Sequence, residues 1–317
     1  MAIIDFLKEN NIPYKENVLL SNVTGMNLRG ELPLIAYPIS IKQLSTLYIE
    51  LIKSKITYEI VGGLTNTYLC EGFSREILVI TTHVKDIIEK KNLIIVGCGY
   101  GLSSLSKRLT INGFKHFSGL VGIPGTIGAA AINNSGAFSD SISDIVQSVS
   151  ILDHNGNLVD MSADELCYSP RNSKLKGTQF GVLLSVTLNL SKSATPEYLI
   201  KKMEDNQRNR KENIDGSRKS LGSIVAGYTI NRIWEEHRIA NIFKKIIYTP
   251  FKKTKYRKKI LCFSEFFVLG NLRFIKHCDN IGRFCWEKDT TEKDFMDYLS
   301  FLKKKSKKIV LEIDIKK

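Results

Sequence analysis

Two glycine-rich turns are the first places in the sequence where residue type and spacing could support chemistry. One turn reads Gly62-Gly63-Leu64-Thr65-Asn66, and the other is GIPGTIG over 122–128. Closely spaced glycines expose successive backbone N–H groups without a Cβ in the way, and such groups bind phosphate oxygens. Neither turn has the spacing of a Rossmann dinucleotide site or of a P-loop. A single turn of this kind is more often structural, but two of them beside short strands favour a diphosphate cofactor.

The segments around these turns combine helical and extended patterns. Apolar spacing predicts helices over 1–15, 40–52, 101–112, 197–213 and 292–305. Short apolar or alternating runs predict strands over 58–61, 68–69, 76–82, 146–152, 181–190 and 309–315. The strands 146–152 and 181–190 are expected to flank the turn at 154–156. After the connector helix 197–213, the rest of the chain is expected to mix short strands with the helix 292–305, ahead of the final strand 309–315. This mixture predicts an α+β protein.

The formal net charge of +14 is concentrated in the C-terminal part of the chain. Residues 1–191 contain 16 basic and 16 acidic side chains, whereas residues 192–317 contain 30 basic and 16 acidic ones. Such an excess indicates an anionic ligand, a nucleic-acid surface or simply a Lys-rich solvated face. No zinc-finger spacing, RNA-recognition strand or basic heptad region accompanies the charge, so nucleic acid is not expected as a partner.

Length and composition set further limits. The chain of 317 residues is long enough for two domains, and its 43% hydrophobic and 25% charged side chains are typical of a globular protein. The longest apolar runs are far too short to span a bilayer, and the N-terminus lacks the pattern of a secretory signal. The six cysteines show no CxxC or metal-ligand spacing. We therefore expect reduced thiols, no metal site and a cytoplasmic protein.

Residues 122–173 resemble the flavin-binding core of the MurB family, the FAD-dependent UDP-N-acetylenolpyruvoylglucosamine reductases of peptidoglycan synthesis. GIPGTIGAA and NNSGAF are similar to the family's GIPG(T/S)xGGA and NxGAYG motifs, and PRNS is similar to YRxS. Weaker resemblances follow in the family's order: 59–73 resembles LGGGSNLL, 220–224 resembles SAGSxF, and 310–315 resembles VxLEPEV. Arg210 lies 13 residues before Ser223, as a connector Arg does in the family.

The resemblance implies a particular architecture. A two-subdomain FAD-binding unit of the PCMH, or vanillyl-alcohol-oxidase, type would precede a C-terminal α+β substrate-binding domain. We accordingly expect an FAD-binding domain over 1–191, with subdomains of about 1–82 and 83–191, and a basic substrate-binding domain over 192–317. The short connection between Leu190 and Gly222 resembles the type II subgroup of the family. A monomer is expected.

The resemblance also implies the reaction and the residues that bind its cofactor. NADPH would reduce non-covalently bound FAD, hydride would pass to C3 of an enolpyruvyl nucleotide sugar, and C2 would be protonated. Because UDP, the carboxylate and NADPH are all anions, the basic domain suits them. The expected cofactor-binding residues are Gly62, Gly63, Leu64, Thr65, Asn66, Gly122, Ile123, Pro124, Gly125, Thr126, Gly128, Asn134 and Gly136.

Three residues occupy positions that are catalytic in the family. Hydride addition at C3 drives electron density onto the substrate carboxylate, and Arg171 has the planar fork that stabilises such an anion. Ser223 corresponds to the proton donor to C2, and Asp314 to a C-terminal catalytic Glu. Glu312 is the alternative carboxylate, because alternation along a strand places it on the same face as Asp314. Purely structural roles remain open for Arg171, as a salt-bridge residue, and for Ser223, as a turn residue.

Several positions depart from the family pattern. Pro170 replaces the Tyr that precedes the catalytic Arg, Leu64 stands at a glycine position of the phosphate turn, and 225–228 replaces an FKNP segment near the substrate. Residues 243–279 are basic and match no family segment. FAD binding is therefore better supported than the original substrate, and a related cell-surface sugar is an alternative. The alternative from a different class is a catalytically impaired member that binds a nucleotide sugar or another polyanion.

Overall fold

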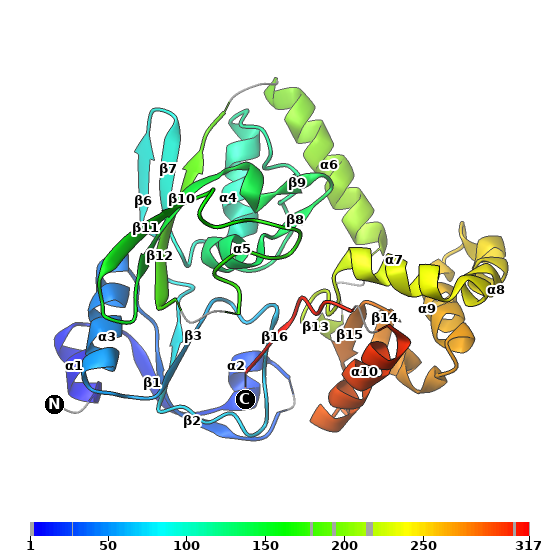
Figure 1. Cartoon of the computed structure of the whole chain (residues 1–317), viewed down its shortest axis with the longest axis horizontal. Coiled ribbons are helices and arrows are strands. Elements are labelled where there is room, and N and C mark those ends of the chain that lie inside the picture. Colours follow the sequence, from blue (N-terminus) through cyan, green and yellow to red (C-terminus); the bar gives the residue numbers. More distant parts are fainter. Residues whose placement is uncertain are drawn as a thin grey trace. The chain divides into compact units, whose positions relative to one another are not determined.

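The computed structural model describes residues 3–26, 28–177, 180–191, 195–213, 218–306 and 309–316 (Figure 1). The chain forms two compact units. The first consists of Met1–Val18, Glu31–Leu64 and Ser74–Arg210, and the second of Leu19–Gly30, Thr65–Phe73 and Lys211–Lys317. The chain therefore enters the second unit three times. The domains expected from the sequence, 1–191 and 192–317, remain a prediction, and the compact units follow a different path because two N-terminal segments join the second unit.

The first unit contains a four-stranded sheet in the order β1-β2-β5-β3. Its strands are β1 (Tyr14–Leu19), β2 (Glu31–Ala36), β5 (Ile77–Ile80) and β3 (Tyr58–Val61). Strand β5 pairs in parallel with both β2 and β3, and all of its residues are buried, as is usual for a central parallel strand covered on both faces. The sequence predicted no strand before residue 58, so β1 and β2 were both missed.

Two helices accompany this sheet, α1 (Ile3–Glu9) and α3 (Ile41–Lys53). Helix α3 begins after Ser40, whose hydroxyl accepts a hydrogen bond from the Gln43 N–H at 3.2 Å. Its buried face consists of Leu44, Leu47, Tyr48 and Leu51. The helix predicted over 40–52 is thus confirmed.

The second sheet of the first unit is antiparallel and has the order β11-β10-β12-β7-β6. Its strands are β11 (Leu158–Ser162), β10 (Val146–Leu152), β12 (Val182–Asn189), β7 (Leu93–Gly97) and β6 (Ile87–Lys90). The turn at 154–156 joins β10 to β11, a strand that was not predicted from the sequence, and β12 pairs with the other edge of β10. The prediction that the strand 181–190 follows this turn was therefore wrong, because β11 and the segment 163–181 come between.

Helices and short strands complete the first unit. They are α4 (Leu102–Ile111), α5 (Ile127–Asn133), β8 (Gly136–Ala137), β9 (Asp140–Ser141), the 3₁₀ turn η1 (Ile142–Asp144) and α6 (Pro196–Asn213). Helix α5 packs against β12 and β7 (Figure 1). One continuous apolar core joins both sheets with α3, α4 and α5. The segment 122–128 and the first residues of the turn 62–66 therefore belong to the unit that contains this core.

The second unit contains small sheets and helices. Its β-structure consists of the parallel pair β4 (Thr67–Leu69) and β16 (Asp314–Lys316) and the sheet β13 (Lys219–Ser220), β15 (Arg283–Trp286) and β14 (Cys278–Asn280). Its helices are α2 (Leu20–Thr24), α7 (Gly227–Glu236), α8 (Arg238–Tyr248), η2 (Thr249–Phe251), α9 (Arg257–Val268), η3 (Leu272–His277) and α10 (Glu292–Lys305). The core is aromatic: Tyr68 stacks on Trp286 at 5.5 Å between ring centroids and lies 4.7 Å from Phe295.

The second unit corrects two expectations. Residues between 227 and 268 form three helices, not the short strands expected there. The final strand was predicted over 309–315, but β16 covers only Asp314–Lys316, while Val225 and Leu311 form an isolated antiparallel bridge. The mixture of helices and sheets in both units confirms the α+β class.

Candidate active site

Gly62, at the start of the first glycine-rich turn, lies beside the second turn in the first unit. A Cβ on Gly62 would stand 2.8 Å from Thr126 Oγ1 and 3.6 Å from the Ala129 Cβ, so this approach requires a glycine. Strand β3 ends just before Gly62, and α5 begins just after Thr126, whose hydroxyl accepts a hydrogen bond from the Ala129 N–H at 3.3 Å. Two segments separated by some sixty residues in the sequence thus form one backbone surface.

Some backbone N–H groups of the segment 122–128 already donate hydrogen bonds within the protein, so fewer are available to a ligand. Four of its N–H groups are used within the unit, namely those of Gly122, Ile123, Ile127 and Gly128. Pro124 has no N–H group. Among the described residues, the N–H groups of Gly125 and Thr126 donate to no protein acceptor. Gly125 has a φ of +107°, which suits glycine, and these two N–H groups are the ones that a phosphate could use.

Arg210, near the C-terminal end of α6, lies against the same segment. A Cβ on Gly122 would come within 3.2 Å of Arg210 Nε, and Arg210 Nη2 donates to the Gly119 carbonyl at 3.4 Å. Burial lowers the pKa of Arg210, and its buried Nε has no hydrogen-bond partner among the described residues. A half-buried cation with an unused donor fits an anionic group held by this turn. From the sequence, only the spacing between Arg210 and Ser223 resembles the family, and Arg210 was not among the predicted site residues.

The turn 62–66 divides between the two units. Leu64 ends a segment of the first unit, and Thr65 begins a segment of the second. Leu64 has a φ of +53°, so it keeps the left-handed conformation of a glycine position at a cost of about 1–2 kcal/mol. Asn66 belongs to the second unit, where its Nδ2 donates to the Glu312 carbonyl at 2.9 Å. The residues expected to form one cofactor-binding turn are therefore held by two different units.

Asn134 and Gly136 form a second cluster in the first unit, together with Arg171. Asn134 ends α5 with a left-handed φ of +46°, and its Nδ2 donates to the Ser169 carbonyl at 2.8 Å. The Arg171 guanidinium donates from Nη2 to the Gly136 carbonyl at 2.6 Å and from Nη1 to the Asn134 carbonyl at 3.4 Å. A Cβ on Gly136 would lie 2.7 Å from the Asp140 carbonyl oxygen, so packing between β8 and β9 also requires this glycine.

The backbone around Arg171 forms a tight turn. The Asn172 N–H donates to the Ser169 carbonyl at 3.0 Å, and Arg171 has a φ of +59°. Pro170 precedes it, and Pro followed by a residue of positive φ is the pattern of a type II turn. Pro170 therefore fixes the backbone from which the Arg171 side chain extends.

Ser223 lies in the second unit on a segment with a fixed backbone and an exposed side chain. Gly222 before it has a φ of +71°, and the Ile224 N–H after it donates to the Gly282 carbonyl at 2.8 Å. A Cβ on Gly222 would lie 4.0 Å from Asn66 Oδ1, a buried acceptor that has no hydrogen-bond partner among the described residues. Gly222, the residue before Ser223, thus lies near a polar atom that no described residue satisfies.

The two candidate carboxylates lie on the segment that pairs with these residues. The Glu312 N–H donates to the Ile224 carbonyl at 2.9 Å, and the Asp314 N–H donates to the Asn66 carbonyl at 3.0 Å. The Asp314 side chain is 54% exposed and forms an ion pair with Lys316 at 3.0 Å. Within the second unit, the fold therefore gathers Asn66, Ser223, Glu312 and Asp314 along adjacent backbone segments. It does not separate the roles of the two carboxylates.

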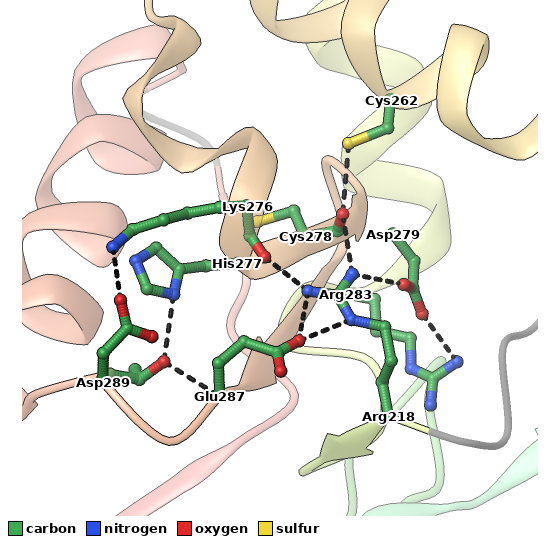
Figure 2. A network of polar contacts seen from close by, with 10 residues as sticks. Arg218, Cys262, Lys276, His277, Cys278, Asp279, Arg283, Glu287 and Asp289 are labelled. Carbon is green, nitrogen blue, oxygen red and sulfur yellow. Dashed lines mark hydrogen bonds and ion pairs between the residues drawn. The ribbon is translucent and has the colours of Figure 1, made fainter.

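A network centred on Arg218 anchors the chain that leads to Ser223 (Figure 2). Arg218 Nη1 donates to Asp279 Oδ1 at 2.8 Å, and its Nε donates to Glu287 Oε1 at 2.8 Å. Asp279 also forms an ion pair with Arg283 at 3.0 Å, and Arg283 Nε donates to Ser220 Oγ at 2.9 Å. Because these contacts join β13 to β14 and β15, they fix the backbone just before Ser223.

Comparison with known proteins agrees with this geometry. Residues 33–162 match a family model described as an FAD binding domain. A UDP-N-acetylenolpyruvoylglucosamine reductase of Caldicellulosiruptor saccharolyticus is 30% identical over 210 residues, which span 65% of this chain and 67% of that protein. The chain belongs to the UDP-N-acetylenolpyruvoylglucosamine reductase family. A reductase of the same name from Caldanaerobacter subterraneus is 28% identical over 235 residues, spanning 73% of this chain and 76% of the relative.

A solved structure supports the same family at the level of the fold. The structure titled UDP-N-acetylenolpyruvylglucosamine reductase (MurB) from Thermus caldophilus superposes with a TM-score of 0.66 at 19% identity, covering 96% of this chain and 99% of the other. The chain is thus an FAD-dependent oxidoreductase of the UDP-N-acetylenolpyruvoylglucosamine reductase family. The free N–H groups of Gly125 and Thr126 and the unused donor of Arg210 fit the diphosphate of FAD.

Among the described residues, no helix is long and apolar enough to cross a membrane. In the same part of the chain, no group of His, Cys, Asp or Glu side chains has the arrangement of a metal site.

Proposed function

We propose that this chain reduces the enolpyruvyl ether of a UDP-linked N-acetylglucosamine, or of a closely related nucleotide sugar, with NADPH as the reductant. When bound, FAD supplies the hydride chemistry between the nicotinamide and the substrate. The observation that carries the proposal is that Gly62 contacts Thr126 while Arg210 lies against Gly122. Within the described part of the chain, this surface offers an anionic cofactor the free N–H groups of Gly125 and Thr126 and a cation without a carboxylate partner.

Arg171 is proposed to stabilise the negative charge that develops on the substrate carboxylate when C3 receives hydride. Its guanidinium has five N–H donors, and its contacts with the carbonyls of Asn134 and Gly136 hold the planar group in one orientation. The type II turn with Pro170 at its second position fixes the backbone. A preorganised cation of this kind stabilises charge without having to reorganise during the reaction.

Ser223 is proposed to donate the proton that C2 needs after hydride addition. Its exposed hydroxyl extends from a backbone that is fixed on both sides, and a hydroxyl must be well positioned to act as a general acid. A carboxylate at Asp314, or at Glu312 on the same face, would assist this proton transfer. The proposed cofactor-binding set keeps all the residues expected from the sequence and adds Arg210.

One observation favours the alternative of a catalytically impaired binding protein. Val225 and Ala226, which replace part of the family's FKNP segment, are fully buried, so their side chains are not available to a ligand.

Purified protein should nevertheless bind FAD, either as isolated or after reconstitution, and denaturation should release the flavin into the supernatant because the attachment is non-covalent. Protein that cannot be reconstituted with FAD would support the binding module, and flavin that stays with the denatured chain would contradict non-covalent attachment.

The product of turnover tests the substrate. In the absence of oxygen, the FAD-loaded protein should oxidise more than about one equivalent of NADPH only when an enolpyruvyl nucleotide sugar is present. Mass spectrometry should find that sugar heavier by one hydride and one proton. NADH in place of NADPH serves as the comparison for the reductant. NADPH oxidation without a reduced sugar, across a panel of enolpyruvyl nucleotide sugars, would contradict the proposal.

A further inference from the structure

Helix α8 presents four large apolar residues outward. Ile239, Ile242, Phe243 and Ile246 recur at the spacing of one helical face, and they are 73%, 58%, 55% and 63% exposed. The less exposed face of the helix carries the polar Asn241 and Lys244 beside Ala240, Ile247 and Tyr248. In a helix that only packs on its own protein, the apolar stripe would face the core. The outer face of α8, defined by these four apolar residues, therefore indicates an external apolar partner.

The segment around α8 has a one-sided charge. Residues 237–264 contain seven Lys and two Arg but neither Asp nor Glu. Some of these cations contact other groups of the unit. Lys244 lies 3.7 Å from the centroid of the Trp234 ring, and Arg257 forms an ion pair with Glu212 at 3.5 Å. Lys258 Nζ donates to the Lys211 carbonyl at 3.3 Å, and Lys255 Nζ lies 5.1 Å from the centroid of the neighbouring Tyr256 ring. Five lysines remain exposed, namely Lys245, Lys252, Lys253, Lys255 and Lys259. An anionic surface would complement this charge.

Further exposed aromatic side chains follow α8. Phe251 in η2 is 41% exposed, and Phe263 and Phe267 of α9 stack on each other at 5.5 Å while remaining 41% and 53% exposed. Helices α8 and α9 pack together in the second unit (yellow to orange in Figure 1). Exposed Ile and Phe beside lysines are the composition of helices that lie in the interface of an anionic bilayer. A nucleic-acid surface would need no apolar stripe and favours Arg over Lys.

We propose that the pair α8–α9 is an interfacial module that binds the chain to the surface of an anionic lipid bilayer. The apolar face of α8 enters the boundary between head groups and acyl chains, and the exposed lysines contact the anionic head groups. The module adds a binding activity to the proposed reductase and does not depend on it. It gives a role to the basic stretch 243–279, which the resemblance to the reductase family left unexplained.

Vesicle flotation tests this proposal. The FAD-loaded full-length chain should float with vesicles of phosphatidylcholine mixed with phosphatidylglycerol and bind vesicles of phosphatidylcholine alone at least about tenfold more weakly, because each lysine contributes roughly fivefold at an anionic surface. The double substitution Ile242→Ser with Ile246→Ser should weaken binding by roughly tenfold or more, because it removes the inserting side chains. Lys252→Gln with Lys253→Gln should weaken binding and reduce its dependence on salt.

Matched controls separate the surface from general effects. Leu158→Ser with Ile88→Ser removes two side chains of similar exposure (65% and 53%) from the first unit and should leave flotation unchanged. Equal binding to both kinds of vesicle, or no binding to either, would overturn the proposal. Reversible self-association that the Ile242→Ser with Ile246→Ser variant abolishes, without flotation of the wild type, would assign the face to a second copy of the chain and would also overturn it.

Discussion

Arg210 is the residue whose environment most directly reports an anionic ligand. We expect Arg210→Gln to weaken FAD binding by roughly 10- to 100-fold, the range for one hydrogen bond to a charged group. The variant should fold normally, because no carboxylate among the described residues pairs with Arg210. Fluorescence titration of the apoprotein with FAD measures the effect. Arg208→Gln is the control, since that side chain is 70% exposed on the same helix, and an unchanged FAD affinity in Arg210→Gln would remove Arg210 from the site.

Arg171 should affect turnover far more than stability. Arg171→Lys keeps the charge but loses the planar fork, so kcat should fall by about a hundredfold, as for the loss of one preorganised transition-state contact. The melting temperature should change little. Arg108→Lys, which alters a surface ion pair with Glu89 at 3.0 Å, is the control. A lowered melting temperature with unchanged turnover would make Arg171 a residue that only holds Asn134 and Gly136 in place.

Ser223→Ala should impair only one of the two half-reactions. Reduction by NADPH needs no proton at C2, so it should proceed at nearly the wild-type rate, whereas reoxidation by the enolpyruvyl substrate should slow by roughly a hundredfold or more. Ser223→Cys should recover part of the activity, because a thiol is a stronger acid of similar reach. Stopped-flow absorbance of the flavin separates the halves. Equal slowing of both halves, or of neither, would make Ser223 a turn residue.

At this scale the sequence predicted some residues and not others. The motif GIPGTIG identified the correct backbone segment, because glycine spacing reports backbone conformation directly. It did not reveal that the N–H groups of Gly122 and Gly128 are already used, since their acceptors lie elsewhere in the chain. The buried Nε of Arg210 has no hydrogen-bond partner among the described residues because of how α6 packs, and no local sequence pattern reports that packing.

At the scale of the elements, helix α9 carries a buried acid. Glu265 is 5% exposed, its Oε2 accepts a hydrogen bond from the Ile281 N–H at 2.9 Å, and burial raises its pKa from 4.5 to about 7. Between these values the folded protein holds a proton that the unfolded chain has lost. The free energy of unfolding that this group contributes therefore falls as pH rises through the window, and the loss is complete above it.

Glu265→Gln should remove this dependence, because the amide stays neutral and keeps an acceptor for the Ile281 N–H. We expect the variant to gain about 2–3 kcal/mol over the wild type at about pH 8 and little at about pH 4.5. Urea denaturation across that range measures the difference. Burial lowers the pKa of His277, so protonation of this residue at acid pH lowers the free energy of unfolding of both proteins. Because the decrease is similar in both, it does not affect the difference between them. Parallel stability curves would show that Glu265 is ionised in the folded protein.

Periodicity predicted the elements whose apolar faces point to the core. The capped helices α3 and α10 and the strand β10 follow their expected ranges closely, because spacing, caps and burial agree. Helix α8 was missed although its apolar residues have helical spacing, since a basic stretch with its apolar side outward resembles neither a core helix nor a polar one. The short strand β4 was predicted, but its parallel partner β16 lies far away in the sequence.

At the scale of the whole molecule, the α+β class followed from the sequence, but the path of the chain did not. The charge count divided the chain at residue 191, whereas Leu19–Gly30 and Thr65–Phe73 belong to the second unit. These crossings depend on long-range contacts such as β4 with β16 and the Asn66 side chain with the Glu312 carbonyl. Composition reports neither contact.

The central claim is that the chain is a flavin reductase of an enolpyruvyl nucleotide sugar, and anaerobic reoxidation of its flavin tests that claim most directly. The FAD-loaded wild-type protein is first reduced with NADPH in the absence of oxygen and is then mixed with UDP-N-acetylglucosamine enolpyruvate. We predict that the visible flavin band returns within a single turnover and that the sugar leaves as its reduced lactyl ether. A flavin that stays bleached with this substrate and with related enolpyruvyl nucleotide sugars would contradict the claim.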